Sequence, residues 1–162
     1  MSKASWRWFA LAALLVLADQ ATKALVLSRF ALGERLEVTP FFNLLFVYNP
    51  GAAFSFLSEA GGWQKPLLVA FALGAAALVS VLIVRRPGER LLCTGLSLIL
   101  GGALGNVVDR LRFGQVVDFL DFHAAGWHFP AFTAADSAIT LGAALLILEG
   151  FVSRDRRAGA SS

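Results

Sequence analysis

Four aspartates, Asp19, Asp109, Asp118 and Asp136, stand in or beside apolar stretches of this sequence. An ionisable side chain near hydrocarbon is costly, so each of the four is a candidate functional residue. Two carboxylates that converge at a partly dry site can share one proton, and one then acts as a base while the other acts as an acid. Two of these aspartates would form a water-activating pair, provided that the fold brings them together.

The composition is typical of a membrane protein with a single compact bundle. Of its 162 residues, 57% are hydrophobic and 15% are charged, whereas a soluble domain is usually ~45–50% apolar and ~25% charged. The net charge of +3 does not indicate nucleic-acid binding, because the basic residues are not gathered in one patch. The single cysteine, Cys93, excludes an intramolecular disulfide and is interpreted as a small buried hydrophobe.

Four stretches approach the ~20 apolar residues that a membrane-spanning helix needs. They cover about residues 8–27, 66–84, 91–108 and 133–151, which leaves external segments at about 28–65 and 109–132. We therefore predict a membrane all-α fold, a four-transmembrane-helix bundle that forms one domain over residues 1–162. The tail beyond Phe151 is expected to be frayed.

The orientation of the bundle follows from the basic residues near the ends of the helices. One side would carry Lys3, Arg7, Arg85, Arg86, Arg90, Arg154, Arg156 and Arg157. The basic residues of the other side are diluted by Glu and Asp, so both termini are predicted to be cytoplasmic. A cleavable signal peptide ending near Ala18 is the competing interpretation of the first stretch. It fits less well, because the apolar pattern continues past Ala18 and cleavage would leave an odd number of spans.

The first external segment contains signals for local structure. Residues 36–48 are rich in Val, Phe, Leu and Tyr, which favours a short strand or hairpin. The turn signal Asn49-Pro50-Gly51 follows. Residues 52–57, with Trp63 beyond them, suit a piece that lies in the membrane interface. We predict a small external β and interfacial-helix element between the first and second helices.

Helical spacing indicates how the charged residues are placed. A rise of 1.5 Å per residue puts all four aspartates in the outer half of the bundle or at its edge. Asp19 and Lys23 lie at i and i+4 and can therefore pair on one face of the helix. The pair either belongs to a functional site or neutralises itself and only stabilises the bundle. Asn106, Asp109 and Arg110 also share one face, where Arg110 could hold a carboxylate or a carbonyl, or could simply anchor the helix end.

Asp118 and Asp136 form the pair without a basic neighbour in the sequence. If they lie close together at an apolar boundary, they cannot both ionise easily and would act as a general acid–base pair. The alternative is an ordinary loop aspartate together with a helix-start aspartate favoured by the helix dipole. The spacing of His123 and His128 relative to the aspartates does not match a metal motif.

Five motifs occur in a fixed order within this four-helix frame. They are Asp19-Gln20-Ala21-Thr22-Lys23, Asn49-Pro50-Gly51-Ala52-Ala53-Phe54, Gly101-Gly102-Ala103-Leu104-Gly105-Asn106-Val107-Val108-Asp109-Arg110, Val116-Val117-Asp118-Phe119 and Phe132-Thr133-Ala134-Ala135-Asp136. On these motifs the chain resembles the bacterial lipoprotein signal peptidases, or type II signal peptidases, over nearly all of its length. The resemblance implies an aspartic peptidase of the inner membrane.

The resemblance also implies roles for individual residues. Asp118 and Asp136 match the catalytic pair. The remaining matches line the site, hold the substrate backbone or support the catalytic pair. Those that line the site or hold the substrate are Asn49, Gly51, Asn106 and Arg110. Asp109 would orient Arg110, and Asp19 with Lys23 would order the site from beneath. Thr133 stands where the family usually has Asn, so one hydrogen bond to the substrate or to a catalytic aspartate is expected to differ.

The substrate implied by the resemblance is a diacylglyceryl-modified prolipoprotein, cut just before its lipid-bearing cysteine. It would enter sideways from the membrane lipids to a site at the external face, and no metal, other cofactor or nucleic acid is implied. Two alternatives stay open on the residues alone. One is a small ion-coupled carrier that uses Asp19 and Lys23 as a relay, although no inverted repeat supports it. The other is a non-catalytic scaffold or binding protein.

Overall fold

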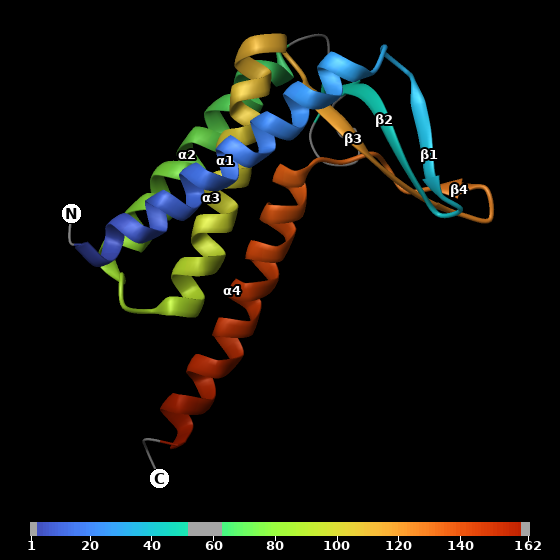
Figure 1. Ribbon diagram of the computed structural model, residues 1–162. Helices are drawn as coiled ribbons and strands as arrows, with labels where there is room; N and C mark the ends of the chain where they lie inside the picture. Colours follow the sequence, from blue (N-terminus) through green and yellow to red (C-terminus); the bar gives the residue numbers. More distant parts are fainter. Residues whose placement is uncertain (1–2, 52–62, 160–162) are drawn as a thin grey trace.

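The computed structural model describes residues 3–51 and 63–159. Figure 1 shows a bundle of long helices with a small sheet at one end. In chain order the elements are α1 (Lys3–Arg29), β1 (Arg35–Thr39), β2 (Phe42–Asn49), α2 (Gln64–Arg85), α3 (Arg90–Phe113), β3 (Val116–Ala124), β4 (Trp127–His128) and α4 (Ala134–Gly159). In the described part of the chain, four helices are long and apolar enough to cross a membrane, as predicted. The predicted interfacial piece at residues 52–57 lies outside the described residues.

Helix α3 lies at the centre of the bundle and packs against α1, α2 and α4. Glycines allow its close approach to α4: a Cβ added at Gly95 would lie 2.9 Å from the carbonyl oxygen of Gly142. Small residues matter here because lipid supplies no hydrophobic force between helices, so close packing must hold them together. The apolar core between α1, α2 and α3 consists of Trp8, Ala12, Ala76, Val79, Ile83, Cys93, Leu96 and Leu100.

The start of α1, the α2–α3 turn and the end of α4 all lie at the end of the bundle away from the sheet (Figure 1). A contact ties two of them together, since the indole N–H of Trp8 donates to the carbonyl oxygen of Pro87 at 3.0 Å. The basic ends of all four helices of the described chain are therefore gathered at one end of the bundle. Which side of a membrane this end faces stays a prediction.

The sheet at the other end is antiparallel, and its strands follow the order β1-β2-β3-β4. β1 and β2 lie between the first two helices, where the sequence predicts strands, whereas β3 and β4 come from the segment between α3 and α4, for which no strand was predicted. The physical reason is that β2 would otherwise expose an unpaired edge. Instead β3 covers that edge, with Asn43 opposite Asp121 and Val47 opposite Asp118.

Two boundaries differ from the predicted ones. Helix α3 does not end at residue 108 but continues to Phe113, so Asp109 and Arg110 are helical rather than part of an external loop. Gly114 then ends the helix at φ +73°, a left-handed conformation that favours glycine. The tail beyond Phe151, which was expected to be frayed, continues as helix to the end of α4.

A second apolar cluster joins the sheet to the bundle. Val26 near the end of α1 packs with Phe46 of β2 and with Val117 and Phe119 of β3, and all four are buried. Because Asp118 lies between the last two, this packing fixes β3 against the bundle at that position. Residues in a strand alternate between faces, so the Asp118 side chain points away from this cluster.

Candidate active site

Asp118 and Asp136 line the same cavity, which has a volume of about 580 Å³. Asp118 is on β3, whereas Asp136 is in the first turn of α4. The side chains of Asn49, Asn106 and Arg110 line the cavity together with them. The other walls are largely apolar and come from residues 129–132 and from α4. The fold thus brings two carboxylates from different elements to one partly dry space.

Asp118 is buried and has few hydrogen-bond donors. Its Oδ2 atom accepts from the side-chain amide of Asn49 at 3.0 Å, while its buried Oδ1 has no partner among the described residues. Burial, reinforced by the negative charge of Asp136, raises the pKa of Asp118 to about 7 against the opposing effects of Asn49, Lys23 and Arg110. Asp118 is therefore suited to hold a proton near neutral pH.

Asp136 has three donors, two of them from one residue. The backbone N–H and the hydroxyl of Thr133 both donate to Asp136 Oδ2 at 3.0 Å, and the amide of Asn106 donates to Oδ1 at 2.8 Å. The Thr133 hydroxyl oxygen also lies 3.1 Å from the Asp136 backbone N–H, which makes Thr133 the N-cap of α4. Reciprocal contacts of this kind form a capping box. This arrangement is suited to an ionised carboxylate.

A buried ion triad lies beneath the cavity. The ammonium of Lys23 is 2.8 Å from Asp19 Oδ2 and 2.7 Å from Asp109 Oδ2, and all three side chains are buried. The predicted pairing of Asp19 with Lys23 is therefore confirmed, and it extends to a third group. Lys23 also donates to the amide oxygen of Asn106 at 3.2 Å. Gln20 donates to Asp109 Oδ1 at 2.8 Å.

The two carboxylates of the triad also accept hydrogen bonds from the main chain. The N–H of Val117, directly before Asp118, donates to Asp109 Oδ2 at 3.1 Å. The N–H of Ala135, in the first turn of α4, donates to Asp19 Oδ1 at 3.0 Å. The triad therefore holds both backbone segments that carry the cavity aspartates.

Arg110 holds the turn that follows β2. Its guanidinium donates to the carbonyl oxygen of Gly51 at 2.9 Å, and the N–H of Gly51 donates to the side-chain oxygen of Asn49 at 3.0 Å. The expected role of Asp109 was wrong in one respect. Its carboxylate is engaged by Lys23, Gln20 and the backbone of β3 rather than by Arg110, because it points toward α1.

All ten residues singled out in the sequence belong to this cavity or to the network of contacts that supports it. Two features were not found from the sequence. Gln20 was not named as a site residue, although a polar side chain next to Asp19 within an apolar run was the available signal. The capping box was also missed, although threonine three residues before an acidic residue at a helix start predicts it.

Known proteins resemble this chain over most of its length. A family model described as signal peptidase (SPase) II matches residues 11–152. The lipoprotein signal peptidase of Paraburkholderia phytofirmans is 56% identical over 142 residues, which cover 88% of this chain and 83% of that protein. The lipoprotein signal peptidase of Paraburkholderia phymatum is 53% identical over 142 residues, which cover 88% of this chain and 86% of that protein.

The fold is also similar to solved structures. One is a bacterial membrane enzyme determined by the in meso method at 2.3 Å resolution, with a TM-score of 0.82, 29% identity, and coverage of 93% of this chain and 90% of that chain. Another, determined by the same method at 1.9 Å, has a TM-score of 0.68 and 31% identity, with coverage of 88% and 91% respectively. With the family model and these close relatives in agreement, the chain belongs to the signal peptidase II family.

Proposed function

We propose that this protein is an aspartic endopeptidase that removes the signal peptide from diacylglyceryl-modified prolipoproteins, cutting just before the lipid-bearing cysteine. The observation that carries the proposal is the pair of carboxylates in one cavity with contrasting surroundings, Asp118 with one donor and Asp136 with three. The relatives named lipoprotein signal peptidase support the choice of substrate.

The contrasting surroundings of the two aspartates assign the base to Asp136 and the acid to Asp118 in the proposed mechanism. Asp136, ionised, takes a proton from a water molecule whose oxygen attacks the scissile carbonyl carbon. Asp118, protonated, donates to the carbonyl oxygen, so that a tetrahedral diol forms. When the C–N bond breaks, Asp136 gives its proton to the leaving amine and Asp118 recovers a proton from the diol. The products are a carboxyl group and an amine, and both aspartates return to their starting states.

The position of the cavity suits a substrate that stays partly in lipid. Water must reach the aspartates, and they lie at the sheet end of the bundle rather than in its middle. The apolar walls from residues 129–132 and α4 would contact the apolar parts of the substrate. The excess of basic residues at the opposite end of the bundle supports a cytoplasmic location for that end, and with it a cavity at the external face of the bacterial inner membrane.

The test is cleavage of a purified lipid-modified prolipoprotein in detergent by the wild type, Asp118→Asn and Asp136→Asn. Glu37→Gln is the matched control, because Glu37 is an exposed carboxylate on β1, outside the cavity. We expect the wild type and Glu37→Gln to cut equally, and both aspartate variants to remain folded and inactive. Cleavage by either aspartate variant at the wild-type rate would refute the mechanism. A folded wild type that leaves the substrate uncut would refute the assignment.

A further inference from the structure

Asp121 and His128 form a polar contact that the cleavage chemistry does not use. Nδ1 of His128 lies 2.8 Å from Asp121 Oδ1 and 3.1 Å from Oδ2. The amide of Asn43 donates to Oδ2 at 2.8 Å, and the Nε atom of Arg35 is 3.7 Å from it. Burial alone would raise the pKa of Asp121, but these donors outweigh it and hold the pKa below its usual value. Asp121 is thus ionised, so His128 Nδ1 must be the donor.

The strand that carries His128 is weak in itself. β4 contains only Trp127 and His128, and the turn before it places Ala125 at φ +49° and Gly126 at φ +82°. A two-residue hairpin turn with two positive φ angles favours Asn-Gly. An alanine in the left-handed region costs about 1–2 kcal/mol. The contact from His128 to buried Asp121 therefore supplies stability that the strand and its turn lack.

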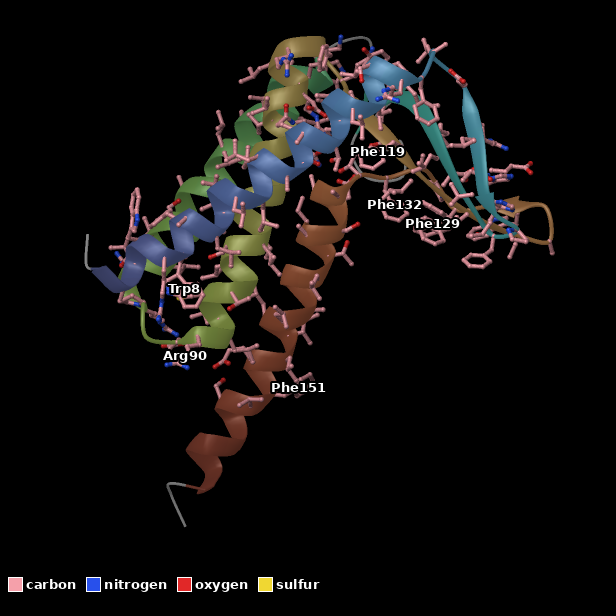
Figure 2. All side chains as sticks on the ribbon, in the orientation of Figure 1. Trp8, Arg90, Phe119, Phe129, Phe132 and Phe151 are labelled. Atoms are coloured by element: carbon pink, nitrogen blue, oxygen red, sulfur yellow. The ribbon has the colours of Figure 1, made fainter. Side chains whose placement is uncertain are left out.

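The chain runs directly from β4 into one wall of the cavity. The N–H of Phe129 donates to the carbonyl oxygen of Phe122 at 2.8 Å, and Phe132 and Leu120 exchange backbone hydrogen bonds at 3.1 and 3.0 Å. The Phe132 ring stacks on Phe122, and Phe129 meets Phe132 edge-on. Figure 2 shows Phe132 beside the start of α4 and Phe129 farther out along the sheet.

We propose that Asp121 and His128 are positioning residues for the cavity and that their hydrogen bond acts as a clamp on β4. Their hydrogen bond fixes the start of the wall at residues 129–132, and the wall sets how tightly the apolar part of the substrate is bound. This inference rests on the function proposed above. Neither residue lines the cavity, so their loss changes binding and not the chemical step. KM rises while kcat stays close to the wild-type value.

Two substitutions at His128 separate the hydrogen bond from the ring. His128→Phe keeps a ring to stack on His123, whose centroid lies 4.9 Å away, but it has no donor for Asp121. His128→Asn places an amide nitrogen near the position of Nδ1 and keeps a donor. We expect KM to rise about tenfold in His128→Phe, the loss typical of a hydrogen bond to a charged group. His128→Asn should stay within about twofold of the wild type.

The matched control is His123→Phe, which removes the other imidazole of the stacked pair and leaves the Asp121–His128 contact in place. We expect its KM to be unchanged. A second site offers a rescue: Ala125→Asn suits the left-handed turn and stabilises the hairpin without touching the clamp. Added to His128→Phe, it should recover part of the lost affinity, because the clamp acts by holding β4.

The same variants are also made in the Asp136→Asn background, and the Kd of labelled, uncut prolipoprotein is measured in detergent. Thermal unfolding confirms that each variant is folded. If folded His128→Phe has unchanged KM and Kd, or if its loss is confined to kcat, the positioning role of Asp121 and His128 is overturned while the proposed function stands. A wild type that binds the prolipoprotein and does not cut it would overturn the proposed function. The Kd comparison would still show whether the Asp121–His128 hydrogen bond affects binding.

Discussion

The backbone N–H of Val117 donates to the buried carboxylate of Asp109 at 3.1 Å, one residue before Asp118. Asp109 is in turn held by the ammonium of Lys23 at 2.7 Å. The position of Asp118 in the cavity therefore depends on an ion pair that lies beneath it, between α1 and α3. The other carboxylate of the triad holds the start of α4 in the same way. A substitution that disrupts the triad should therefore displace both Asp118 and Asp136.

Replacing Lys23 by methionine tests this dependence. The substitution leaves two buried carboxylates close together without a cation, and breaking a buried ion pair in this way costs about 3–5 kcal/mol. We expect a large fall in unfolding temperature in detergent and a loss of cleavage. Lys65→Met is the control, because Lys65 is an exposed residue of α2 outside the triad. Equal unfolding temperatures for the two variants would contradict the role given to the triad.

Asp118→Asn should make the protein more stable while abolishing cleavage. The pKa of Asp118 rises from an ordinary 3.8 to about 7 because the ionised form is buried next to Asp136. That displacement corresponds to roughly 4 kcal/mol at 1.36 kcal/mol per pH unit. Between pH 4 and pH 7 the folded state holds more protons than the unfolded state, so wild-type stability falls as the pH rises. Asparagine has no ionised form and escapes this loss.

The measurement is thermal unfolding of the wild type and Asp118→Asn in detergent at pH 4.5, 6 and 8. The advantage of the variant should be small at pH 4.5 and largest at pH 8, where the wild-type loss is complete. Glu37→Gln, which removes an exposed carboxylate, should show no such trend. A constant difference across the three pH values would mean that the ionisation of Asp118 is not the cause.

Cleavage should follow a bell-shaped pH profile. Asp118 must be protonated to donate to the scissile carbonyl, and its pKa of about 7 means that it loses this proton as the pH rises through neutrality. We expect kcat/KM to fall above pH 7. The acidic limb arises when the aspartate that acts as base becomes protonated, and the two limbs report the pair together. A flat profile from pH 4 to 9, with chemistry rate-limiting, would argue against an aspartate pair.

Thr133→Val should weaken both the helix start and the cavity. Valine has nearly the same shape but no hydroxyl, so α4 loses its N-cap, at a cost of about 0.5–2 kcal/mol. Asp136 loses one of its donors at the same time. Thr133→Asn restores a capping side chain and should recover stability and most of the activity. The measurements are the cleavage rates and unfolding temperatures of the two variants and the wild type. Wild-type activity in both variants would show that the Thr133 hydroxyl is dispensable.

Much of this arrangement could be predicted from the sequence because its signals are local. Apolar runs predict helices in lipid, and the i, i+4 spacing of Asp19 and Lys23 predicts their pairing, since both depend on neighbours within one helix. The meeting of Asp118 with Asp136 was left open by spacing alone. It depends on how β3 and α4 are placed in space, which no single element determines.

Apart from Gln20 and the capping box, which had local signals, the missed features depend on contacts between distant segments. β3 forms because β2 offers an edge, and β2 lies far from β3 in the chain. Likewise, Asp109 is adjacent to Arg110 in sequence, yet it pairs with Lys23 of another helix because α1 packs directly against α3. The same packing keeps α3 helical beyond its predicted end, since Asp109 is neutralised there and does not need to reach water.

Gly105→Ala tests the fit between α3 and the triad. A Cβ at this position would lie 2.6 Å from Asp19 Oδ2, so the carboxylate or one helix must move. Because Asp19 also pairs with Lys23, the shift disturbs the support of the cavity. We expect a lower unfolding temperature and a cleavage rate reduced at least about tenfold, since small displacements are costly in catalysis.

Gly74→Ala on α2 is the matched control, because nothing lies within 4 Å of its Cβ. It should raise stability by up to about 1 kcal/mol through helix propensity. Similar effects of the two substitutions would show that the contact with Asp19 is not what requires glycine at position 105.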